Sequence, residues 1–233
     1  MPEIVELINH CVKTGGHIDY VDINASKVTS MKTDKAVYDN IFNANLIAAD
    51  GQSVVWGTRF LGTPLSGRIA GVDLMQNLVE LAYREKYTCY FLGAKESVVL
   101  SLVELYTQKY GKEIIAGYRN GYFNNEDENE IVDQIVKSKA NFLFVGITSP
   151  KKEIFLNAHK EALSSVNFTM GVGGSFDVIS GFTKRAPPWM QETGMEWFYR
   201  FLQEPRRMWK RYLVSNSLFI KLVIAEKLRR NKK

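Results

Sequence analysis

The segment from residue 87 to residue 171 alternates short apolar runs with helical patterns, and no other feature constrains the fold as strongly. Strands that alternate with helices of this length pair in parallel through right-handed crossovers. The sequence therefore predicts an α/β protein with a Rossmann-like, mostly parallel sheet, in which ligands lie at the carboxyl ends of the strands. The expected strands are residues 88–92, 113–118, 142–145 and 167–171, and the expected helices are residues 97–110, 128–138 and 150–161.

The same order begins earlier in the chain. Residues 17–23 and 46–51 are typical of strands, and residues 33–43 and 72–86 are typical of helices. A length of 233 residues with 45% apolar residues suffices for one large domain with a normal core, or for a domain with an appendage.

The net charge of +5 is unevenly distributed along the chain. Residues 200–233 contain eleven Lys and Arg residues against two Glu residues, a balance of +9, which leaves residues 1–199 at −4. The sequence therefore describes a mildly acidic body with a basic tail.

Two adjacent prolines, Pro187 and Pro188, would interrupt any helix and mark a boundary before the tail. Beyond them, aromatic residues are interleaved with arginines in an amphipathic helical pattern, which suits the surface of an anionic membrane. We therefore expect an α/β core over residues 1–188, with residues 87–188 as its Rossmann-like half, and an amphipathic basic appendage over residues 189–233.

Cysteine usage and hydropathy indicate the cellular setting. Cys11 and Cys89 are the only cysteines, so the chain offers neither a disulfide framework nor a cysteine-rich zinc site, and a reducing cytoplasmic setting is expected. No secretory signal opens the sequence. The apolar run 218–225 contains Lys221 and is far shorter than the ~20 residues that span a bilayer. We expect a protein that touches a membrane without crossing it.

The sequence contains no metal-binding pattern. His10, His17 and His159 are far apart, and no DxD pair stands near a strand end, so we predict neither a metal site nor a cofactor. Arginine would then have to stabilise any diphosphate.

Asp50 is the first candidate for chemistry. A carboxylate at the end of a strand would point into the ligand crevice and could act as a general base. Because Asp-Gly is also a common turn pair, the residues alone leave both interpretations open.

Glycines and lysines at other strand ends indicate an anionic ligand. Gly93 lies between a strand and a helix, where free N–H groups favour a phosphate or ribose. An ordinary turn from the strand to the helix would explain this glycine equally well. Without a GxGxxG or Walker pattern, dinucleotide oxidoreductases and P-loop enzymes are disfavoured. Gly173 and Gly174 indicate a tight turn where backbone N–H groups approach a ligand. Lys151 and Lys152 oppose the dipole of the helix they begin, which favours either an anionic ligand or exposed lysines without a specific role.

Several segments, taken in order, resemble the WecG/TagA/CpsF glycosyltransferases (glycosyltransferase family 26). The resemblance covers nearly the whole chain, and it depends on the order and spacing of the segments rather than on any one of them. Its most specific part is the glycine motif at 171–177 followed by RAPPW, EWFYR and EPRR. The other matching segments are residues 24–25, 49–51, 68, 71–75, 91–93, 121–123, 146–153 and 211–212.

Members of this family are inverting, metal-independent enzymes. They move a sugar from a UDP-sugar to a polyprenyl-diphosphate-linked sugar at the cytoplasmic membrane face, in wall teichoic acid, enterobacterial common antigen and capsule or exopolysaccharide assembly. The resemblance thus implies a hexosyltransferase that is peripheral on the inner face of the plasma membrane. It also implies that residues 87–188 bind the nucleotide and that the appendage completes the active site and docks on the membrane.

The resemblance also implies roles for individual residues. Asp50 resembles the general base that takes the proton from the acceptor hydroxyl, and Arg68 resembles a residue near the leaving diphosphate of the donor. Cations of the appendage would stabilise charge on UDP or hold the lipid diphosphate in place of a metal. We expect Arg200, Arg207 and Arg211 to be the catalytic cations. The expected substrate-binding residues are Asn24, Gly93, Gly173, Gly174, Asp177, Arg185, Arg206 and Lys210.

Two positions depart from the family pattern. Asp22 stands where many members have threonine, and Lys152 stands where they have glutamine. Both place charge near the sugar, so we include them among the substrate-binding residues. The donor is then an N-acetylmannosamine-like sugar, another hexose or a hexuronic acid, and Lys152 would meet that sugar or pair with Asp22.

Two other functions remain as alternatives. A non-catalytic protein that binds a nucleotide-sugar or a polyprenyl lipid, and recruits other enzymes to the membrane, would keep the pocket without turnover. A nucleic-acid-binding protein would use the basic tail, but the acidic body and the apolar stripe of the tail argue against a nucleic-acid partner. Homo-oligomerisation stays open.

Overall fold

The computed structural model describes residues 1–231, with the side chains of residues 207, 208 and 210–212 outside that description. The chain forms two compact units. Unit 1 comprises Met1–Val21, Asp39–Ile47 and Gly71–Thr183, and unit 2 comprises Asp22–Tyr38, Ala48–Ala70 and Lys184–Lys233.

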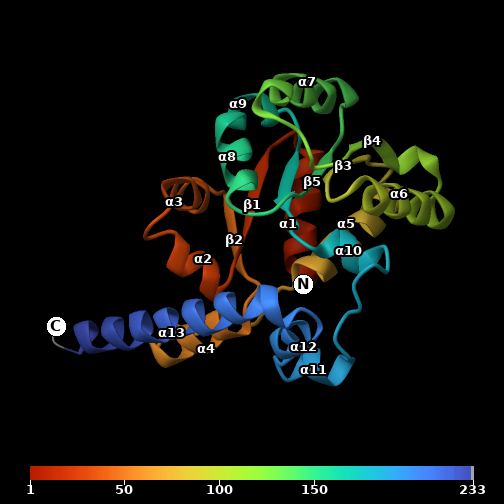
Figure 1. Cartoon of the computed structure of the whole chain (residues 1–233). Coiled ribbons are helices and arrows are strands. Elements are labelled where there is room, and N and C mark those ends of the chain that lie inside the picture. The colour runs from red at the N-terminus through yellow and green to blue at the C-terminus, as the bar shows by residue number, and fades with distance from the viewer. Residues whose placement is uncertain (232–233) are drawn as a thin grey trace. The chain divides into compact units, whose positions relative to one another are not determined.

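Within the described residues, six strands form one sheet in the order β2-β1-β6-β5-β3-β4 (Figure 1). The pairs β1–β6, β6–β5, β5–β3 and β3–β4 are parallel. The predicted parallel α/β sheet is therefore confirmed. The strands are β1 (Ile18–Ile23), β2 (Leu46–Ala49), β3 (Cys89–Gly93), β4 (Ile115–Arg119), β5 (Phe142–Gly146) and β6 (Phe168–Gly171).

Helices connect and follow these strands. The helices before β3 are α1 (Pro2–Lys13), α2 (Ala25–Ser30), α3 (Lys35–Phe42), α4 (Gln52–Phe60) and α5 (Gly71–Glu85). Those between β3 and β6 are α6 (Glu96–Tyr110), α7 (Glu128–Ser138), α8 (Lys151–Ala158) and α9 (Lys160–Leu163), with 3-10 turns η1 (Lys112–Ile114) and η2 (Asn125–Asp127). The last helices are α10 (Ser175–Ile179), α11 (Pro188–Glu192), α12 (Glu196–Gln203) and α13 (Pro205–Arg230).

Local chemistry sets several helix boundaries. α6 ends at Gly111, whose φ of 89° is accessible to glycine at no steric cost. The side-chain oxygen of Asn24 accepts a hydrogen bond from the backbone N–H of Lys27 at 3.1 Å and so caps α2. Pro188 occupies the first turn of α11, where a missing N–H is tolerated.

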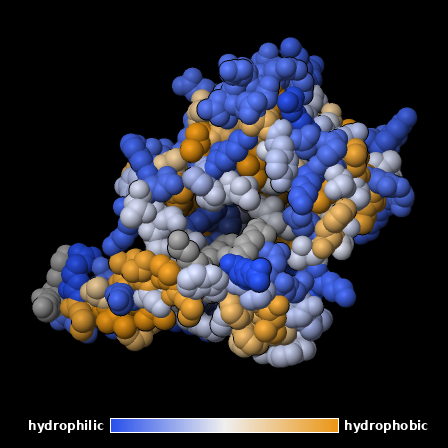
Figure 2. All heavy atoms as spheres, in the orientation of Figure 1, coloured by the Kyte–Doolittle hydropathy of each residue, from blue (hydrophilic) through white to orange (hydrophobic). Residues whose placement is uncertain are grey.

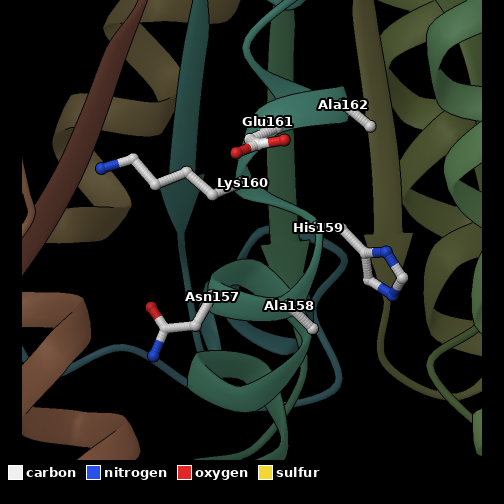
Figure 3. Close-up of a pocket in the computed structure, with 6 residues that line it drawn as sticks. All are labelled: Asn157, Ala158, His159, Lys160, Glu161 and Ala162. Atoms are coloured by element: carbon white, nitrogen blue, oxygen red, sulfur yellow. The ribbon is translucent and has the colours of Figure 1, made fainter.

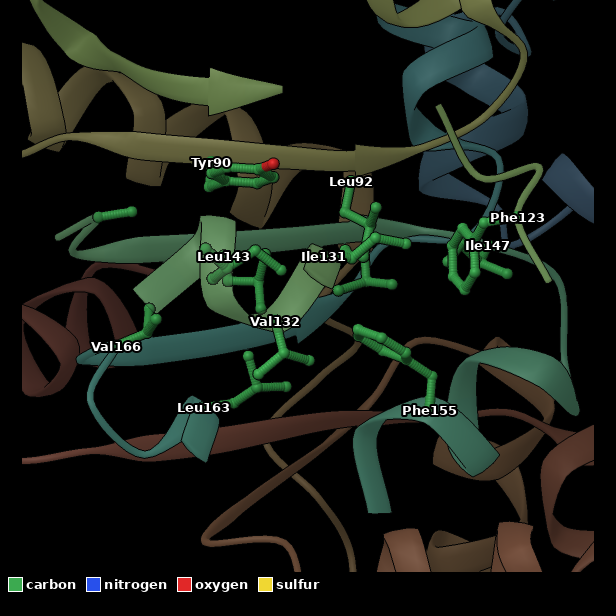
Figure 4. Packing of buried hydrophobic residues seen from close by; sticks show 13 residues of the cluster. Tyr90, Leu92, Phe123, Ile131, Val132, Leu143, Ile147, Phe155, Leu163 and Val166 are labelled. Carbon is green, nitrogen blue, oxygen red and sulfur yellow. The ribbon is translucent and has the colours of Figure 1, made fainter. Parts of the chain in front are cut away.

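The core of unit 1 covers both faces of β3 and β5, because apolar side chains fill nearly every position of these strands. On one face, Tyr90, Leu92, Leu143 and Val145 pack against α7, α8 and α9 (Figure 4). The helical members of this cluster are Ile131, Val132, Ile135, Phe155 and Leu163.

The opposite face of the same strands is aromatic. The ring of Phe91 stacks on Phe144 and on Tyr106 of α6, each with centroids 5.7 Å apart, and meets Phe176 of α10 edge-on at 6.0 Å. Burial on both faces explains why these strands are continuous apolar runs in the sequence.

In unit 2, α13 lies along α2 and α4 (Figure 1). Gly57 of α4 permits this close packing, since a Cβ added there would lie 3.0 Å from Phe219 and 3.3 Å from Val223 of α13. At the far end of α13, Arg230 donates a hydrogen bond to the carbonyl oxygen of Leu61 at 3.3 Å.

Several sequence-based boundaries differ from the structure. The expected single helix over residues 150–161 is wrong, because the backbone leaves helical geometry at His159 (φ −114°, ψ 18°) and separates α8 from α9. The tail is helical as predicted, but it comprises α11, α12 and α13. The prediction did not include α1, α2, α4 or α10. The division of the chain at residues 188 and 189 stays a prediction.

Candidate active site

Asp50 follows the last residue of β2 in unit 2 and is held by its backbone. Its N–H and that of Gly51 both donate to the carbonyl oxygen of Ile23 at the end of β1, at 2.9 and 3.1 Å. The N–H of Ile69 donates to the carbonyl oxygen of Ala49 at 2.8 Å. These bonds fix the Asp50 backbone at the carboxyl end of its strand and place the segment that carries Arg68 beside it.

Asn24 and Asp22 lie near this strand end. A Cβ added to Gly51 would lie 3.0 Å from the Cα and Cβ of Asn24, so Gly51 and Asn24 are in close contact. The Asp22 carboxylate binds the ammonium of Lys27 at 2.6 Å, and that ammonium also donates to the Asp22 carbonyl oxygen at 3.0 Å. Lys27 is buried, and its spacing from Asp22 is the only sequence signal that could have indicated this ion pair.

Three of the predicted arginines of unit 2 converge on one carboxylate, Glu196. Arg68 Nη2 donates to Glu196 Oε2, while Arg200 Nη2 and Arg185 Nε lie 3.6 and 3.9 Å from Glu196 Oε1. The side chains of Arg68 and Glu196 are only 16% and 9% exposed. We call these four residues the arginine cluster. The prediction did not include Glu196, although its spacing of four from Arg200 on one helix is a signal for the pair.

The segment before Glu196 is shaped by a glycine. Gly194 has a φ of 76°, and a Cβ added to it would lie 2.5 Å from Cγ of Gln52, the first residue of α4. Only glycine allows this approach, which brings the start of α12 against the chain just beyond Asp50. The Gln203 side chain donates to the carbonyl oxygen of Lys184 at 3.1 Å and so anchors α12 beside the segment that carries Arg185.

The remaining predicted cations lie on α13. Arg206 is exposed in the first turn of that helix. The side chains of Arg207, Lys210 and Arg211 are outside the described part of the structure.

In unit 1, Gly93 ends β3 opposite Gly146, which ends β5. The chain passes from β3 outward to β4 and then returns to β5 on the other side of β3, so the strand order reverses between these two glycines. Parallel sheets bind ligands at such a point. A Cβ added to Gly93 would lie 2.5 Å from the carbonyl carbon of Gly146, which excludes any larger residue there.

Gly173 and Gly174 follow β6 and differ from Gly93 in their surroundings. Gly173 has a φ of 52°, and a Cβ added to either residue would meet no atom of the described chain within 4 Å. The turn therefore leaves space beside its backbone. The Asp177 carbonyl oxygen, in α10, accepts a hydrogen bond from the N–H of Thr183 at 2.9 Å and secures the exit of this turn.

The two lysines at the start of α8 have different environments. Lys151 donates to the Phe123 carbonyl oxygen at 2.5 Å and lies 3.8 Å from the centroid of the Phe123 ring. Lys152 is buried, with its ammonium 3.3 Å from Glu153 Oε1 and its stem over Gly171, where an added Cβ would lie 2.6 Å from the lysine Cδ. Lys152 is therefore not an exposed lysine, and it lies at the carboxyl end of β6.

A separate hollow of about 480 Å³ lies in unit 1 where α8 passes into α9 (Figure 3). Its lining is confined to residues 157–162 and includes His159, whose Nε2 is 3.1 Å from Glu128 Oε2. It contains none of the predicted site residues. Among the described residues, no group of three His, Cys, Asp or Glu side chains is arranged to hold a metal ion.

A parallel sheet with glycines at its strand ends, and a strand-end carboxylate in the same unit as clustered arginines, are typical of α/β enzymes that act on phosphorylated substrates. A match to the sequence profile described as "Glycosyl transferase WecG/TagA/CpsF family" extends over residues 1–233. The chain belongs to this family and is a glycosyltransferase, which confirms the predicted family and the prediction of an enzyme.

Three relatives carry the name N-acetylglucosaminyldiphosphoundecaprenol N-acetyl-beta-D-mannosaminyltransferase. The Bacillus subtilis relative is 36% identical over 180 residues, which are 77% of this chain and 69% of that protein. The Bacillus spizizenii relative is 36% identical over 171 residues, 73% of this chain and 65% of that protein. The Staphylococcus aureus relative is 35% identical over 191 residues, 82% of this chain and 72% of that protein.

Proposed function

We propose that this glycosyltransferase moves a sugar from a UDP-sugar to a polyprenyl-diphosphate-linked sugar during assembly of a bacterial cell-surface polymer such as teichoic acid. The acceptor follows from the names of the three relatives. The observation that carries the proposal is the presence, in one compact unit, of a strand-end carboxylate and the arginine cluster.

The reaction is a single displacement at the anomeric carbon of the donor. Asp50 takes the proton from the acceptor hydroxyl as its oxygen forms the new glycosidic bond. The bond between the anomeric carbon and the UDP oxygen breaks at the same time, which inverts the anomeric configuration and leaves UDP as the anionic product. The guanidiniums of Arg68, Arg185 and Arg200 stabilise negative charge on a diphosphate, a role that bidentate arginine contacts fulfil without a metal ion.

The glycine-bearing strand ends of unit 1 bind the nucleotide in this proposal. Gly93 lies at the reversal of strand order, and the open backbone around Gly173 and Gly174 leaves room for phosphate or ribose oxygens near its N–H groups. Asp177, at the exit of this turn, is assigned to the same nucleotide.

The identity of the donor sugar depends on the charged residues that depart from the family pattern. N-acetylmannosamine is the sugar in the names of the relatives. In this chain Asp22 forms an ion pair with Lys27, and Lys152 forms an ion pair with Glu153. Charged groups that already have ion-pair partners suit a neutral sugar rich in hydroxyl groups, whereas a lysine without such a partner would suit the carboxylate of a hexuronic acid. We favour the neutral sugar.

Unit 2 also presents an apolar face suited to the inner surface of the plasma membrane. In Figure 2, apolar residues gather over α13 and α4. Trp209, Leu213, Ile220, Ile224 and Leu228 follow one another along α13 at helical spacing, and each is between 47% and 64% exposed.

The apolar face continues onto α4 through Trp56 and Phe60, which are 50% and 54% exposed. The ammonium of Lys227 lies 5.7 Å from the centroid of the Phe60 ring. Aromatic rings beside cations are typical of the boundary between headgroups and acyl chains. None of the described helices combines the length and apolar character needed to cross a bilayer. Anionic lipid is therefore the proposed occupant, since cations border this face.

A donor screen tests the proposal. The full chain is incubated with UDP-N-acetylmannosamine, UDP-N-acetylglucosamine, UDP-glucose or UDP-glucuronic acid and a short-chain N-acetylglucosamine-diphosphate lipid, and product masses are read. We expect one neutral hexose or N-acetylhexosamine to be added to the lipid, with release of UDP. Binding of a UDP-sugar without a product in any arm would contradict the proposal and favour a non-catalytic recruitment protein.

A further inference from the structure

The arginine cluster has an acidic centre that the sequence prediction did not include. Each carboxylate oxygen of Glu196 has its own partners. Oε2 contacts Arg68, and Oε1 contacts Arg185 and Arg200. The three arginines come from separate segments: the chain after α4, the chain before α11, and α12 itself. One carboxylate therefore joins three parts of unit 2.

The cluster brings cations together at one carboxylate. Arg68 Nη2 and Arg200 Nη2 both contact Glu196, whose side chain is 9% exposed, while the Arg200 side chain is 38% exposed. A guanidinium has five N–H donors, so one that is held by a carboxylate and is partly exposed keeps donors available to an anion. A diphosphate is the anionic ligand in the proposed reaction.

We infer that Glu196 is a positioning residue that aims the arginines at the diphosphate and limits how tightly they hold it. This inference rests on the proposed function. The Glu196 carboxylate occupies donors of Arg68 that a diphosphate would otherwise take, and it keeps the planes of the guanidiniums fixed. Stabilisation that is fixed in place before reaction lowers the barrier, whereas extra binding of the ground state or of product UDP does not.

The inference predicts opposite changes in binding and in turnover. Glu196→Gln keeps the size of the side chain but removes its charge, so the cluster becomes more positive and less well oriented. We expect the affinity for UDP and for inorganic diphosphate to rise about threefold, in line with the loss of one competing charge. We expect kcat to fall about 10²-fold, because misplaced groups lose transition-state contacts.

A second variant separates charge from position. Glu196→Asp keeps the charge but withdraws the carboxylate by one methylene. It should bind inorganic diphosphate as the wild type does and still lose kcat about tenfold or more. Glu192→Gln, on the exposed surface of α11, makes the same charge change and is the matched control; its affinity and kcat should equal those of the wild type.

The measurements are titration calorimetry with UDP and with inorganic diphosphate, steady-state kcat and KM for transfer, and thermal unfolding of each variant. A parallel loss of affinity, kcat and Tm in Glu196→Gln and Glu196→Asp would mean a purely structural role and would overturn the inference. Unchanged kcat in both variants would overturn it as well. If the wild type bound diphosphate but transferred no sugar, the proposed function would fail, while the calorimetric comparison would still decide the inference.

Discussion

Arg68 and Glu196 are 128 positions apart in the sequence, and in the folded chain the Arg68 guanidinium donates a hydrogen bond to the Glu196 carboxylate. This contact ties the segment after α4 to the first residue of α12. The C-terminal helices and the strand-end residue Asp50 therefore belong to one compact unit. The C-terminal region contributes side chains to the candidate site in addition to the apolar face.

Removing Arg68 should destabilise the protein measurably. In Arg68→Ala, the buried Glu196 carboxylate would keep only the longer contacts to Arg185 and Arg200. We expect the free energy of unfolding to fall by about 1–3 kcal/mol, as for other buried groups that lose a partner. Urea denaturation measures this change. Arg59→Ala, at an exposed position of α4, is the control, and an equal effect of both substitutions would refute the assignment.

Two glycine substitutions should separate folding from nucleotide binding. Gly93→Ala places a Cβ 2.5 Å from the Gly146 backbone and should lower the melting temperature strongly. Gly174→Ala meets no described atom within 4 Å, and its φ of −83° suits alanine, so the melting temperature should stay unchanged. If the nucleotide approaches this backbone, the affinity for UDP should fall about tenfold in Gly174→Ala. Full affinity for UDP in Gly174→Ala would remove this residue from the proposed pocket.

The apolar face of α13 should determine binding to anionic vesicles. The triple variant Ile220→Ser, Ile224→Ser and Leu228→Ser removes three exposed apolar side chains, each contributing about 1.5–3 kcal/mol if fully inserted. We expect flotation with phosphatidylglycerol vesicles to be lost, while the melting temperature changes little. The double variant Leu100→Ser and Leu105→Ser, at exposed positions of α6, should float as the wild type does. Flotation of the triple variant at the wild-type level would locate the membrane contact elsewhere.

His17 should make stability depend on pH. Burial lowers the pKa of this histidine, but hydrogen bonds with Asp19 and with the Val166 carbonyl oxygen outweigh burial and raise it overall. A raised pKa in the folded state contributes stability that is fully present below the unfolded pKa of about 6.5 and is lost as pH rises through the folded value.

The difference in unfolding free energy between the wild type and His17→Gln should therefore be larger at about pH 5.5 than at about pH 8.5. Chemical denaturation at both pH values measures it. Lys160, which lies 3.5 Å from Asp19, is kept in all variants. The exposed His10 of α1 provides the matched control, His10→Gln. A difference that grew with pH would have the wrong sign for this account.

The regular part of the fold could be predicted because β3 and β5 are buried on both faces and are therefore continuous apolar runs. α4 escaped prediction because the Asp-Gly pair at residues 50–51 indicates a strand end or a turn, and neither predicts the helix that begins at Gln52. The break between α8 and α9 at His159 was not predicted because no glycine or proline stands there to indicate the end of a helix.

The candidate site stays a prediction, but three of its arginines lie close together in the structure. A sequence without a metal-binding pattern leaves arginine to bind phosphate. Arg68, Arg185 and Arg200, named on that ground, meet at Glu196. Glu196 was missed because a single acid among cations is typical of a solvated helix face. The burial of Lys152 depends on Gly171, whose missing Cβ makes room for the lysine stem, and such a complementarity between distant residues leaves no local pattern in the sequence.

The role of Asp50 is the central claim, and the rate of transfer by Asp50→Asn tests it most directly. The amide keeps the size and the backbone hydrogen bonds of this residue but cannot accept a proton. With the donor sugar identified by the screen and a lipid-diphosphate acceptor, we predict that kcat falls about 10²–10⁴-fold. UDP affinity should stay at the wild-type value, thermal unfolding should show that the variant is folded, and the exposed Asp133→Asn should keep full activity. Equal rates of transfer by Asp50→Asn and the wild type would contradict the account.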